Sequence, residues 1–386
     1  VKDQGHDVHV ITGVPNYPAG EFFEGYSNRQ NREETWAGAR VSRAWTMARG
    51  QRALSLLLNY IIFPIAGIWT AMRKLDDRPD VALVSMPSPL LQALVGIFIA
   101  KRHKVPLVYW VQDIWPESAV LTLRLRNPLI VKPLSWLCGW IYRQADLLLV
   151  QSAAFPPMIE RFGVPAENIR TFPNTAPETY HPLPPNQDAE VTSLVPRSGF
   201  NIMFAGNIGE SQDFDTYLEA ASLLDNRDDI NWVIIGSGRD MKRVQEEVAR
   251  RELSGAFHFL GRHPEHMMPL FFAHADAMLV GLKDNAIFRL TVPYKVQCYM
   301  ACGRPIIASL NGEGARIIKA ADAGIVVPAE TPSALAMAIE KMADSSVAER
   351  DAWAAAGRDF FLKNYAADKV HGDLNNWLLE TVEKYK

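Results

Sequence analysis

Two carboxylates follow a strongly apolar run in the first half of the chain. Asp113 and Glu117 come shortly after Val-Tyr-Trp-Val (108–111), in a segment that also contains Trp115. A carboxylate at the end of a buried strand is costly unless it is paired or faces a polar cleft. The segment therefore predicts a polar site built from acidic and aromatic side chains. The alternative is that Asp113 only caps the turn that follows.

Amide and aromatic side chains follow another predicted strand in the same way. That strand covers residues 8–12, and Asn16 and Tyr17 come after it in Gly-Val-Pro-Asn-Tyr-Pro (13–18). We expect them at the same sheet edge as Asp113, because ligands of open α/β sheets bind outside the carboxyl ends of the strands. Stacked aromatic and amide side chains at that edge suit a sugar.

Two glycine turns in the second half are suited to a phosphate. Gly206 and Gly209 lie between a predicted strand and a predicted helix, and Gly236 holds the equivalent place after the next strand. Unpaired backbone amides and the dipole at a helix N-terminus favour an anion. Two such turns at one sheet edge strengthen the phosphate interpretation. The alternative is that each glycine only allows a tight turn with positive φ.

Lys295 is predicted in the first turn of a short helix that ends at Gly303. The helix dipole opposes a cation in the first turn unless an anion is nearby. This placement suggests a bound phosphate. Arg289, six residues earlier, could assist, although a solvated surface role fits it equally well.

No metal site is predicted. Asp213-Phe-Asp215 matches a D-x-D pattern that some enzymes use to hold a divalent ion, but these aspartates begin a predicted helix, where Asp is a favoured capping residue. Four histidines between residues 258 and 274 fit no H-E-x-x-H spacing. The sequence also has no G-x-S-x-G elbow and no Walker loop, so hydrolase and P-loop interpretations lack their minimal parts.

The elements that position these residues alternate along the chain. Short β-rich runs alternate with longer helical patterns, which predicts an α/β protein with parallel sheets covered by helices. A Pro-rich polar stretch interrupts the pattern at residues 181–199, so we expect two doubly wound domains, 1–189 and 190–386. We expect a cleft at the carboxyl ends of the two sheets, and a C-terminal helix over residues 375–386 that packs back across it.

Composition excludes several classes of protein. The net charge is −3, so no global basic field points to nucleic acid. Three cysteines, at positions 138, 298 and 302, are an odd number and indicate a reduced cytoplasmic chain without a disulfide framework. No signal peptide is recognisable at the start, and the first predicted strand follows so early that we expect a preceding segment.

Residues 53–72 form the most apolar stretch, long enough to cross a bilayer if helical. Pro64 interrupts it, and Ser55, Asn59 and Thr70 fall on one helical face, so a true span is the least favoured interpretation. The region 40–143 holds 14 Lys and Arg against five acids. A basic amphipathic element at a membrane surface and a buried core helix therefore remain as alternatives.

Together these motifs resemble glycosyltransferase family 4, and more narrowly its WbuB-type bacterial surface-polysaccharide branch. The resemblance covers nearly the whole chain in the right order. It rests on Gly-His-Asp-Val-His-Val-Ile-Thr-Gly-Val-Pro-Asn-Tyr-Pro (5–18), Val-Gln-Asp-Ile-Trp-Pro-Glu-Ser (111–118), Phe-Pro-Asn-Thr (172–175), Ala-Gly-Asn-Ile-Gly (205–209), Val-Pro-Tyr-Lys (292–295) and Met-Ala-Cys-Gly-Arg-Pro-Ile-Ile (300–307).

The resemblance implies a GT-B fold, an acceptor bound by the N-terminal domain and a nucleotide-sugar bound by the C-terminal domain, with no cofactor and no essential metal. It also implies that a first strand and a glycine-bearing loop are missing from the start. The implied catalytic residues are Asp113, Glu117 and Lys295; the acceptor-binding residues are Asn16, Tyr17 and Trp115; the donor-binding residues are Gly206, Asn207, Gly209, Gln212, Gly236, Arg262, Thr291, Val292, Lys295 and Glu313.

This sequence departs from the general family pattern at several of these positions. Asn207 and Gln212 stand where the family has Arg and Lys, and the family's paired glutamates would fall at Leu290 and Cys298. Lys295 is then the remaining cation placed for a diphosphate. Similar replacements in the WbuB-like branch indicate a subtype.

The expected function is retaining transfer of a sugar from a UDP-sugar to a lipid-linked oligosaccharide, in a cytoplasmic protein peripheral at the inner membrane face. Nucleic acid is not an expected partner. Two alternatives remain from the sequence: a nonhydrolysing UDP-sugar 2-epimerase, and a sugar-nucleotide-binding protein without catalysis.

Overall fold

The chain folds into two compact units. The computed structural model describes residues 5–16, 20–48, 53–122, 125, 127–185 and 187–386. The first unit is Val1–Phe172 with His371–Lys386, and the second is Pro173–Val370. Residues 173–189, which the sequence places before the domain boundary, belong to the second unit. Ala176 and Tyr180 are buried in its hydrophobic core, as are Val191 and Val195 of the Pro-rich stretch, so the whole segment is anchored there.

The second unit is a doubly wound α/β domain. Its six parallel strands lie in the order β10-β9-β8-β11-β12-β13, so the order reverses between β8 and β11. This is the Rossmann-like order, in which ligands bind at the reversal point. The strands are β8 (Phe200–Asn207), β9 (Ile230–Ser237), β10 (Phe257–Gly261), β11 (Ala277–Gly281), β12 (Ile306–Ser309) and β13 (Gly324–Val327).

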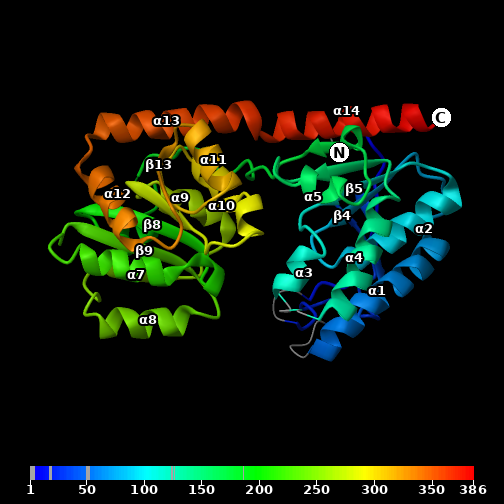
Figure 1. Cartoon of the computed structure of the whole chain (residues 1–386), viewed down its shortest axis with the longest axis horizontal. Coiled ribbons are helices and arrows are strands. Elements are labelled where there is room, and N and C mark those ends of the chain that lie inside the picture. Colours follow the sequence, from blue (N-terminus) through cyan, green and yellow to red (C-terminus); the bar gives the residue numbers. More distant parts are fainter. Residues whose placement is uncertain (1–4, 17–19, 49–52, 123–124, 126, 186) are drawn as a thin grey trace. The chain divides into compact units, whose positions relative to one another are not determined.

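Helices cover both faces of this sheet. One hydrophobic core lies on each face, so successive residues of β8 point to different cores: Ile202 and Phe204 to one, Met203 and Ala205 to the other. Figure 1 shows α7 and α8 on one side, and α10, α11 and α13 on the other. The helices are α6 (Ala189–Leu194), α7 (Phe214–Leu223), α8 (Met241–Arg250), α9 (Met268–Phe272), α10 (Tyr294–Ala301), α11 (Glu313–Ala320), α12 (Pro332–Asp344) and α13 (Val347–Asn364), with 3-10 helices η4 (Glu210–Gln212), η5 (Glu265–Met267) and η6 (Phe288–Leu290).

The first unit contains two sheets. Four parallel strands lie in the order β4-β5-β6-β7, and a separate sheet has the order β1-β3-β2. The strands are β1 (His9–Gly13), β2 (Glu33–Trp36), β3 (Ala39–Ala44), β4 (Ala82–Met86), β5 (Leu107–Val111), β6 (Leu147–Val150) and β7 (Ile169–Thr171). The helices are α1 (Ala53–Lys74), α2 (Ala93–His103), α3 (Glu117–Thr122), α4 (Pro128–Tyr142) and α5 (Pro156–Glu160), with η2 (Leu90–Gln92) and η3 (Ala166–Asn168).

The hairpin β2–β3 is absent from the sequence prediction. Its strand residues Glu33–Trp36 are largely polar, so they give no apolar alternation. The turn is made by Ala37 and Gly38, both with positive φ (44° and 74°). Two positive φ values define the hairpin turns that match strand twist, but Ala is not a typical residue there, so the usual Asn-Gly signal is missing.

The last helix, α14 (Ala367–Tyr385), joins the first unit from His371 onward. Asn375 Oδ1 lies 2.6 Å from His6 Nε2. The Trp377 ring meets Phe172 edge-on, with centroids 6.4 Å apart. The C-terminal residues thus complete the first unit, whose remaining residues end at Phe172.

Candidate functional site

Lys295 lies at the strand-order reversal of the second unit. It sits in the first turn of α10, and its Nζ donates a hydrogen bond to Gln212 Oε1 at 2.5 Å, in the loop that follows β8. Its Nζ is also 4.9 Å from the Phe204 ring centroid. Among the described residues, no carboxylate forms an ion pair with it. Burial lowers the pKa of Lys295 to about 8. A half-buried cation without a counter-charge indicates an anion site.

Gly206 makes room for this lysine. Its φ is +143°, and a Cβ at this position would lie 2.6 Å from Lys295 Cε. The neighbouring residue Ala205 is held by Tyr299, whose hydroxyl accepts a hydrogen bond from the Ala205 amide at 3.2 Å. Glycine at position 206 therefore leaves room for the lysine side chain and permits the positive φ of the strand end.

The second glycine turn is explained by packing. Gly236 is the strand partner of Gly206, and a Cβ on Gly236 would lie 1.9 Å from the Gly206 carbonyl oxygen. A Cβ on Gly238 would approach the Ile208 oxygen equally closely. These glycines therefore let the two loops approach each other, and Gly236 also has the positive φ (+134°) that the tight-turn alternative requires. Gly209 is less constrained, since its Cβ would meet only the Asn207 side chain at 2.8 Å.

Replacing Gly236 with alanine should destabilise the protein by about 2 kcal/mol or more, because the clash is with backbone and φ is +134°. Gly255→Ala is the matched control, because no atom lies within 4 Å of the added Cβ. Chemical denaturation of both variants measures the difference. Equal stability of the two variants would show that the loops do not approach as described.

The start of α11 lies against the loop that precedes α10. A Cβ on Gly314 would lie 3.0 Å from Pro293 Cδ and 3.6 Å from the Thr291 oxygen. The Thr291 hydroxyl donates to the Ile287 oxygen at 2.9 Å, and Val292 is buried. The backbone of Thr291–Val292 is therefore held in place by its own side chains.

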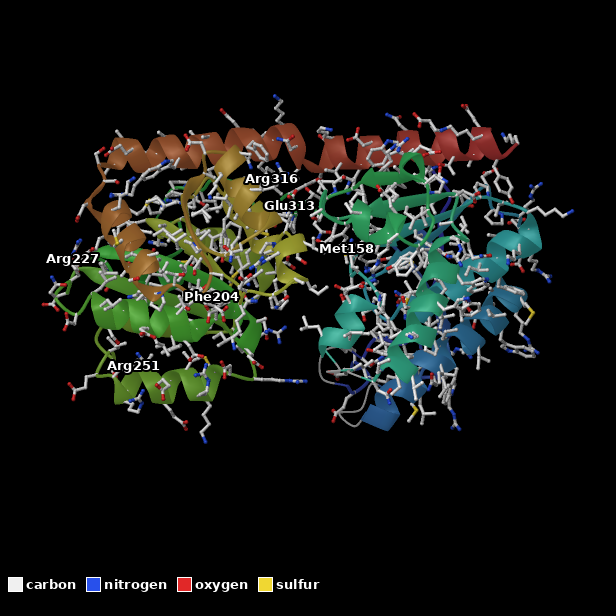
Figure 2. All side chains as sticks on the ribbon, in the orientation of Figure 1. Met158, Phe204, Arg227, Arg251, Glu313 and Arg316 are labelled. Atoms are coloured by element: carbon white, nitrogen blue, oxygen red, sulfur yellow. The ribbon has the colours of Figure 1, made fainter. Side chains whose placement is uncertain are left out.

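Two carboxylates near this loop already carry counter-charges. Glu313 accepts both guanidinium hydrogen bonds of Arg316, at 2.7 and 2.8 Å (Figure 2). Asp284 pairs in the same bidentate way with Arg289. A ribose hydroxyl can therefore bind Glu313 either beside Arg316 or in place of it. Arg289 is likewise engaged, which favours the surface role over a phosphate contact.

Arg262 is the residue directly after β10. It is exposed, and within the part of the chain that the structure describes no carboxylate pairs with it. Its guanidinium is therefore free to meet a ligand at the carboxyl edge of the sheet.

The D-x-D segment does not gather metal ligands. Asp213 is the N-cap of α7, but its carboxylate accepts a hydrogen bond from the Thr216 hydroxyl at 2.6 Å and none from a helix amide. Asp215 pairs with Arg243 at 2.6 Å. In the described ranges no three His, Cys, Asp or Glu side chains are grouped to hold a metal. The predicted helix start is correct, while the capping hydrogen bond is replaced by one to a side chain.

In the first unit, Asp113 follows β5 and is half-buried. No described group donates a hydrogen bond to its carboxylate, so Asp113 does not cap the following turn. Burial raises the pKa of Asp113 to about 6. An unpaired carboxylate held at the carboxyl end of a strand is typical of a functional position.

The neighbours of Asp113 are more firmly engaged. Glu117 forms an ion pair with Arg161. Trp115 is only 8% exposed, and its backbone amide donates a hydrogen bond to the Tyr142 hydroxyl at 3.1 Å. Most of the Trp115 residue therefore belongs to the core, and its role in acceptor binding stays a prediction.

The loop after β1 holds Asn16, whose amide donates to the Val14 oxygen at 2.7 Å. The Thr46 hydroxyl in turn accepts from the Val14 amide at 2.9 Å. Tyr17 lies outside the described residues. Because β1 belongs to the three-stranded sheet and β5 to the four-stranded sheet, Asn16 and Asp113 do not follow strands of one sheet, which corrects the expectation of a shared sheet edge. Thr46 fixes this loop, and the sequence alone gave no signal for it.

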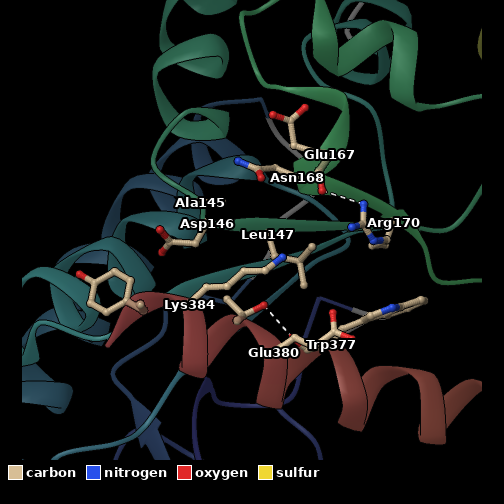
Figure 3. A pocket seen from close by; sticks show the side chains of 11 residues that line it. Ala145, Asp146, Leu147, Glu167, Asn168, Arg170, Trp377, Glu380 and Lys384 are labelled. Atoms are coloured by element: carbon tan, nitrogen blue, oxygen red, sulfur yellow. Dashed lines mark hydrogen bonds between the residues drawn. The ribbon is translucent and has the colours of Figure 1, made fainter.

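A pocket of about 260 Å³ lies in the first unit against α14 (Figure 3). It is lined by residues at the starts of β6 and β7, among them Asp146 and Asn168, and by Trp377 and Lys384 of α14. Ligands of such sheets bind at the opposite, carboxyl edge. This pocket is therefore separate from the candidate site.

Comparison with known proteins identifies the family. A model of the glycosyl transferase 4-like domain matches residues 1–175, and a model of glycosyl transferases group 1 matches residues 199–345. The chain belongs to glycosyltransferase family 4. This glycosyltransferase is 26% identical over 309 residues to Escherichia coli (strain K12) WcaI, which carries the name colanic acid biosynthesis glycosyl transferase; the match covers 78% of this chain and 74% of WcaI.

Solved structures agree on the fold of this glycosyltransferase. Thermosynechococcus elongatus sucrose-phosphate synthase matches with a TM-score of 0.74 and 16% identity, covering 98% of this chain and 90% of the other. Anabaena Alr3699/HepE with UDP and glucose matches with a TM-score of 0.67 and 15% identity, covering 88% and 86%. Both are too distant to show more than the fold. The predicted GT-B fold with two Rossmann-like domains is confirmed.

Proposed function

We propose that this glycosyltransferase moves a sugar from a UDP-sugar to a lipid-linked oligosaccharide during synthesis of a bacterial surface polysaccharide, with retention of the anomeric configuration. The observation that carries the donor assignment is the uncompensated Lys295 cation at the strand-order reversal of the second unit. A diphosphate supplies the missing negative charge.

In this proposal Lys295 stabilises the departing diphosphate. Negative charge develops on the leaving phosphate in the transition state, and a positioned cation in a partly desolvated site lowers its energy. Backbone amides of the Gly206–Gly209 turn and of Thr291–Val292 contribute further donors. Gln212 holds the lysine in place and exchanges its hydrogen bond for the phosphate oxygen.

The first unit supplies the acceptor side. Asp113, with Asn16, orients the acceptor and sugar hydroxyls. Glu117 stays paired with Arg161 and neutralises its positive charge. No described side chain is placed as an obvious nucleophile, so we assign the acceptor proton to an oxygen of the leaving phosphate. The carbon–oxygen bond to the phosphate breaks as the acceptor oxygen attacks from the same side.

The relatives support the two substrates separately. HepE was solved with UDP and glucose, and its fold matches this chain. WcaI is named for colanic acid biosynthesis, a role that fits a lipid-linked saccharide acceptor. Proton NMR of the purified product tests the mechanism: the donor's anomeric configuration should persist, and an inverted product would exclude the retaining proposal.

Turnover should not depend on a divalent ion, because Lys295 supplies the positive charge and Asp213 and Asp215 bond Thr216 and Arg243. EDTA should leave the initial rate within about twofold of the untreated rate. Removal of an essential metal would instead cost several kcal/mol of transition-state stabilisation, and the rate would fall far more. The contrary result has three parts: EDTA abolishes transfer, manganese restores it, and the Asp213→Asn variant responds to neither. That result would show that a metal ion holds the donor.

A further inference from the structure

Helix α1 presents an apolar stripe to solvent. Between residues 58 and 72, every exposed side chain of α1 is apolar: Leu58, Ile61, Ile65, Trp69 and Met72. Their spacing of 3, 4, 4 and 3 places them on one face of the helix. Ile65 is 66% exposed and Trp69 is 54% exposed.

The polar face of α1 points inward. Thr70 is buried, and the Asn59 amide donates to the Met47 oxygen. Gly67 packs so closely on α2 that a Cβ there would lie 2.7 Å from Val95 Cγ2. The amphipathic pattern expected from the sequence is therefore present but inverted relative to an ordinary surface helix. In α8, by contrast, the exposed positions include Lys242 and Glu246.

Helix α4 carries a second stripe. Leu129, Pro133 and Trp136 are exposed and spaced 4 and 3 apart, so they share one face. Leu129 is 82% exposed and Trp136 is 69% exposed. The one charged residue of α4 is Lys132, which is also exposed.

The two stripes belong to one helical layer. Helices α2 and α4 connect β4 to β5 and β5 to β6, which are parallel neighbours, so right-handed crossovers place both helices on the same sheet face. Helix α1 packs on α2, and Lys101 Nζ of α2 lies 5.8 Å from the Trp140 ring of α4. Figure 1 shows α1, α2 and α4 within the first unit.

The layer has a single sign of charge. Helices α1, α2 and α4 contain no Asp or Glu. Of their five basic residues, Lys74 pairs with Glu33, and the other four have no carboxylate partner among the described residues: Arg73, Lys101, Arg102 and Lys132. Arg73 lies over the Trp69 ring, 4.3 Å from its centroid. Apolar side chains flanked by long basic ones are the composition of a surface that lies in the headgroup region of an anionic membrane.

We propose that the exposed stripes of α1 and α4 insert into the interface of an anionic lipid bilayer. This proposal rests on the proposed function, because a lipid-linked acceptor must be reached at a membrane. No helix in the described ranges is long and apolar enough to span a bilayer, so the helices lie in the interface plane. A second copy of this chain is a less suitable partner, because it would bring four unpaired basic side chains against four.

The test uses the whole chain with vesicles of phosphatidylcholine and about 30% phosphatidylglycerol, without donor or acceptor. The variant Ile65→Ser/Trp69→Ser/Trp136→Ser removes three exposed side chains, which leaves the folded core intact. Leu223→Ser/Met337→Ser, two exposed apolar positions of the second unit, is the matched control. Co-sedimentation should show vesicle binding reduced about tenfold or more in the first variant and unchanged in the control.

A second readout locates the contact. Lipids brominated on the acyl chain should quench part of the tryptophan fluorescence of the wild type, and Trp69→Phe/Trp136→Phe should lose most of that quenching while still binding vesicles. Equal vesicle binding by all variants, no binding by the wild type, or a wild-type dimer that the triple variant converts to monomer would each overturn the proposal. UDP calorimetry on the same samples reports the donor site separately, so a failed membrane test leaves the proposed function standing.

Discussion

Replacing Lys295 with methionine should weaken UDP binding by about tenfold to hundredfold, the loss expected for a charge-assisted contact of about 1.5–3 kcal/mol. Isothermal titration calorimetry measures it directly. The same variant should be no less stable than the wild type in the absence of UDP, because it removes a partly buried cation without a counter-charge. A loss of binding combined with unchanged unfolding separates a direct role from a general structural defect.

The pH dependence gives this prediction a sign. Burial holds the pKa of free Lys295 at about 8, and a bound diphosphate must raise it. Binding therefore takes up a proton above about pH 8, and the affinity for UDP should fall as the pH rises through that region. Lys295→Arg keeps its charge and should show little of this dependence. A wild-type affinity that is flat from pH 7 to 10 would remove Lys295 from the donor site.

Asp113→Asn should lower turnover about hundredfold or more while making the protein more stable at pH 7.5. The carboxylate is half-buried and no described group donates a hydrogen bond to it, so its ionised form costs free energy in the folded state. Asparagine keeps the shape and removes the charge. Initial rates and thermal unfolding on the same preparation measure both effects.

The stability gain should depend on pH. Because the pKa of Asp113 is raised to about 6, the folded state binds more protons than the unfolded state between about pH 4 and 6. The cost of the charge is thus fully present above pH 6 and disappears as the pH falls through this window. The melting temperatures of wild type and Asp113→Asn should converge near pH 4. The exposed Asp80→Asn is the control and should show neither effect. A destabilised Asp113→Asn with normal turnover would show that this carboxylate is structural.

The strands of the second unit are predictable because that sheet is buried on both faces, so runs such as Ile-Met-Phe-Ala (202–205) are continuously apolar. The apolar pattern does not predict the β2–β3 hairpin, whose strands are polar and whose turn uses Ala37. It also does not predict the boundary at Phe172/Pro173, because the burial of Tyr180 depends on tertiary contacts.

The candidate site shows the same division. The position of Lys295 at a helix start is readable from the sequence, and so is the need for glycine at Gly206. The ion pairs of Glu313 with Arg316 and of Glu117 with Arg161 are not, because a carboxylate in a motif looks the same whether or not it is already paired. The direction in which the apolar face of α1 points is equally hidden, since both a core helix and an interfacial helix have the same composition.

Mass spectrometry of a lipid-linked oligosaccharide acceptor after incubation with the full chain and a mixture of UDP-sugars tests the central claim most directly. The account predicts that the acceptor gains the mass of one sugar residue, that an equimolar amount of UDP is released, and that Lys295→Met forms little of this product. An unchanged acceptor accompanied by a UDP-sugar converted to its epimer, or by UDP-sugar binding alone, would contradict the assignment of this chain as a transferase of lipid-linked saccharides.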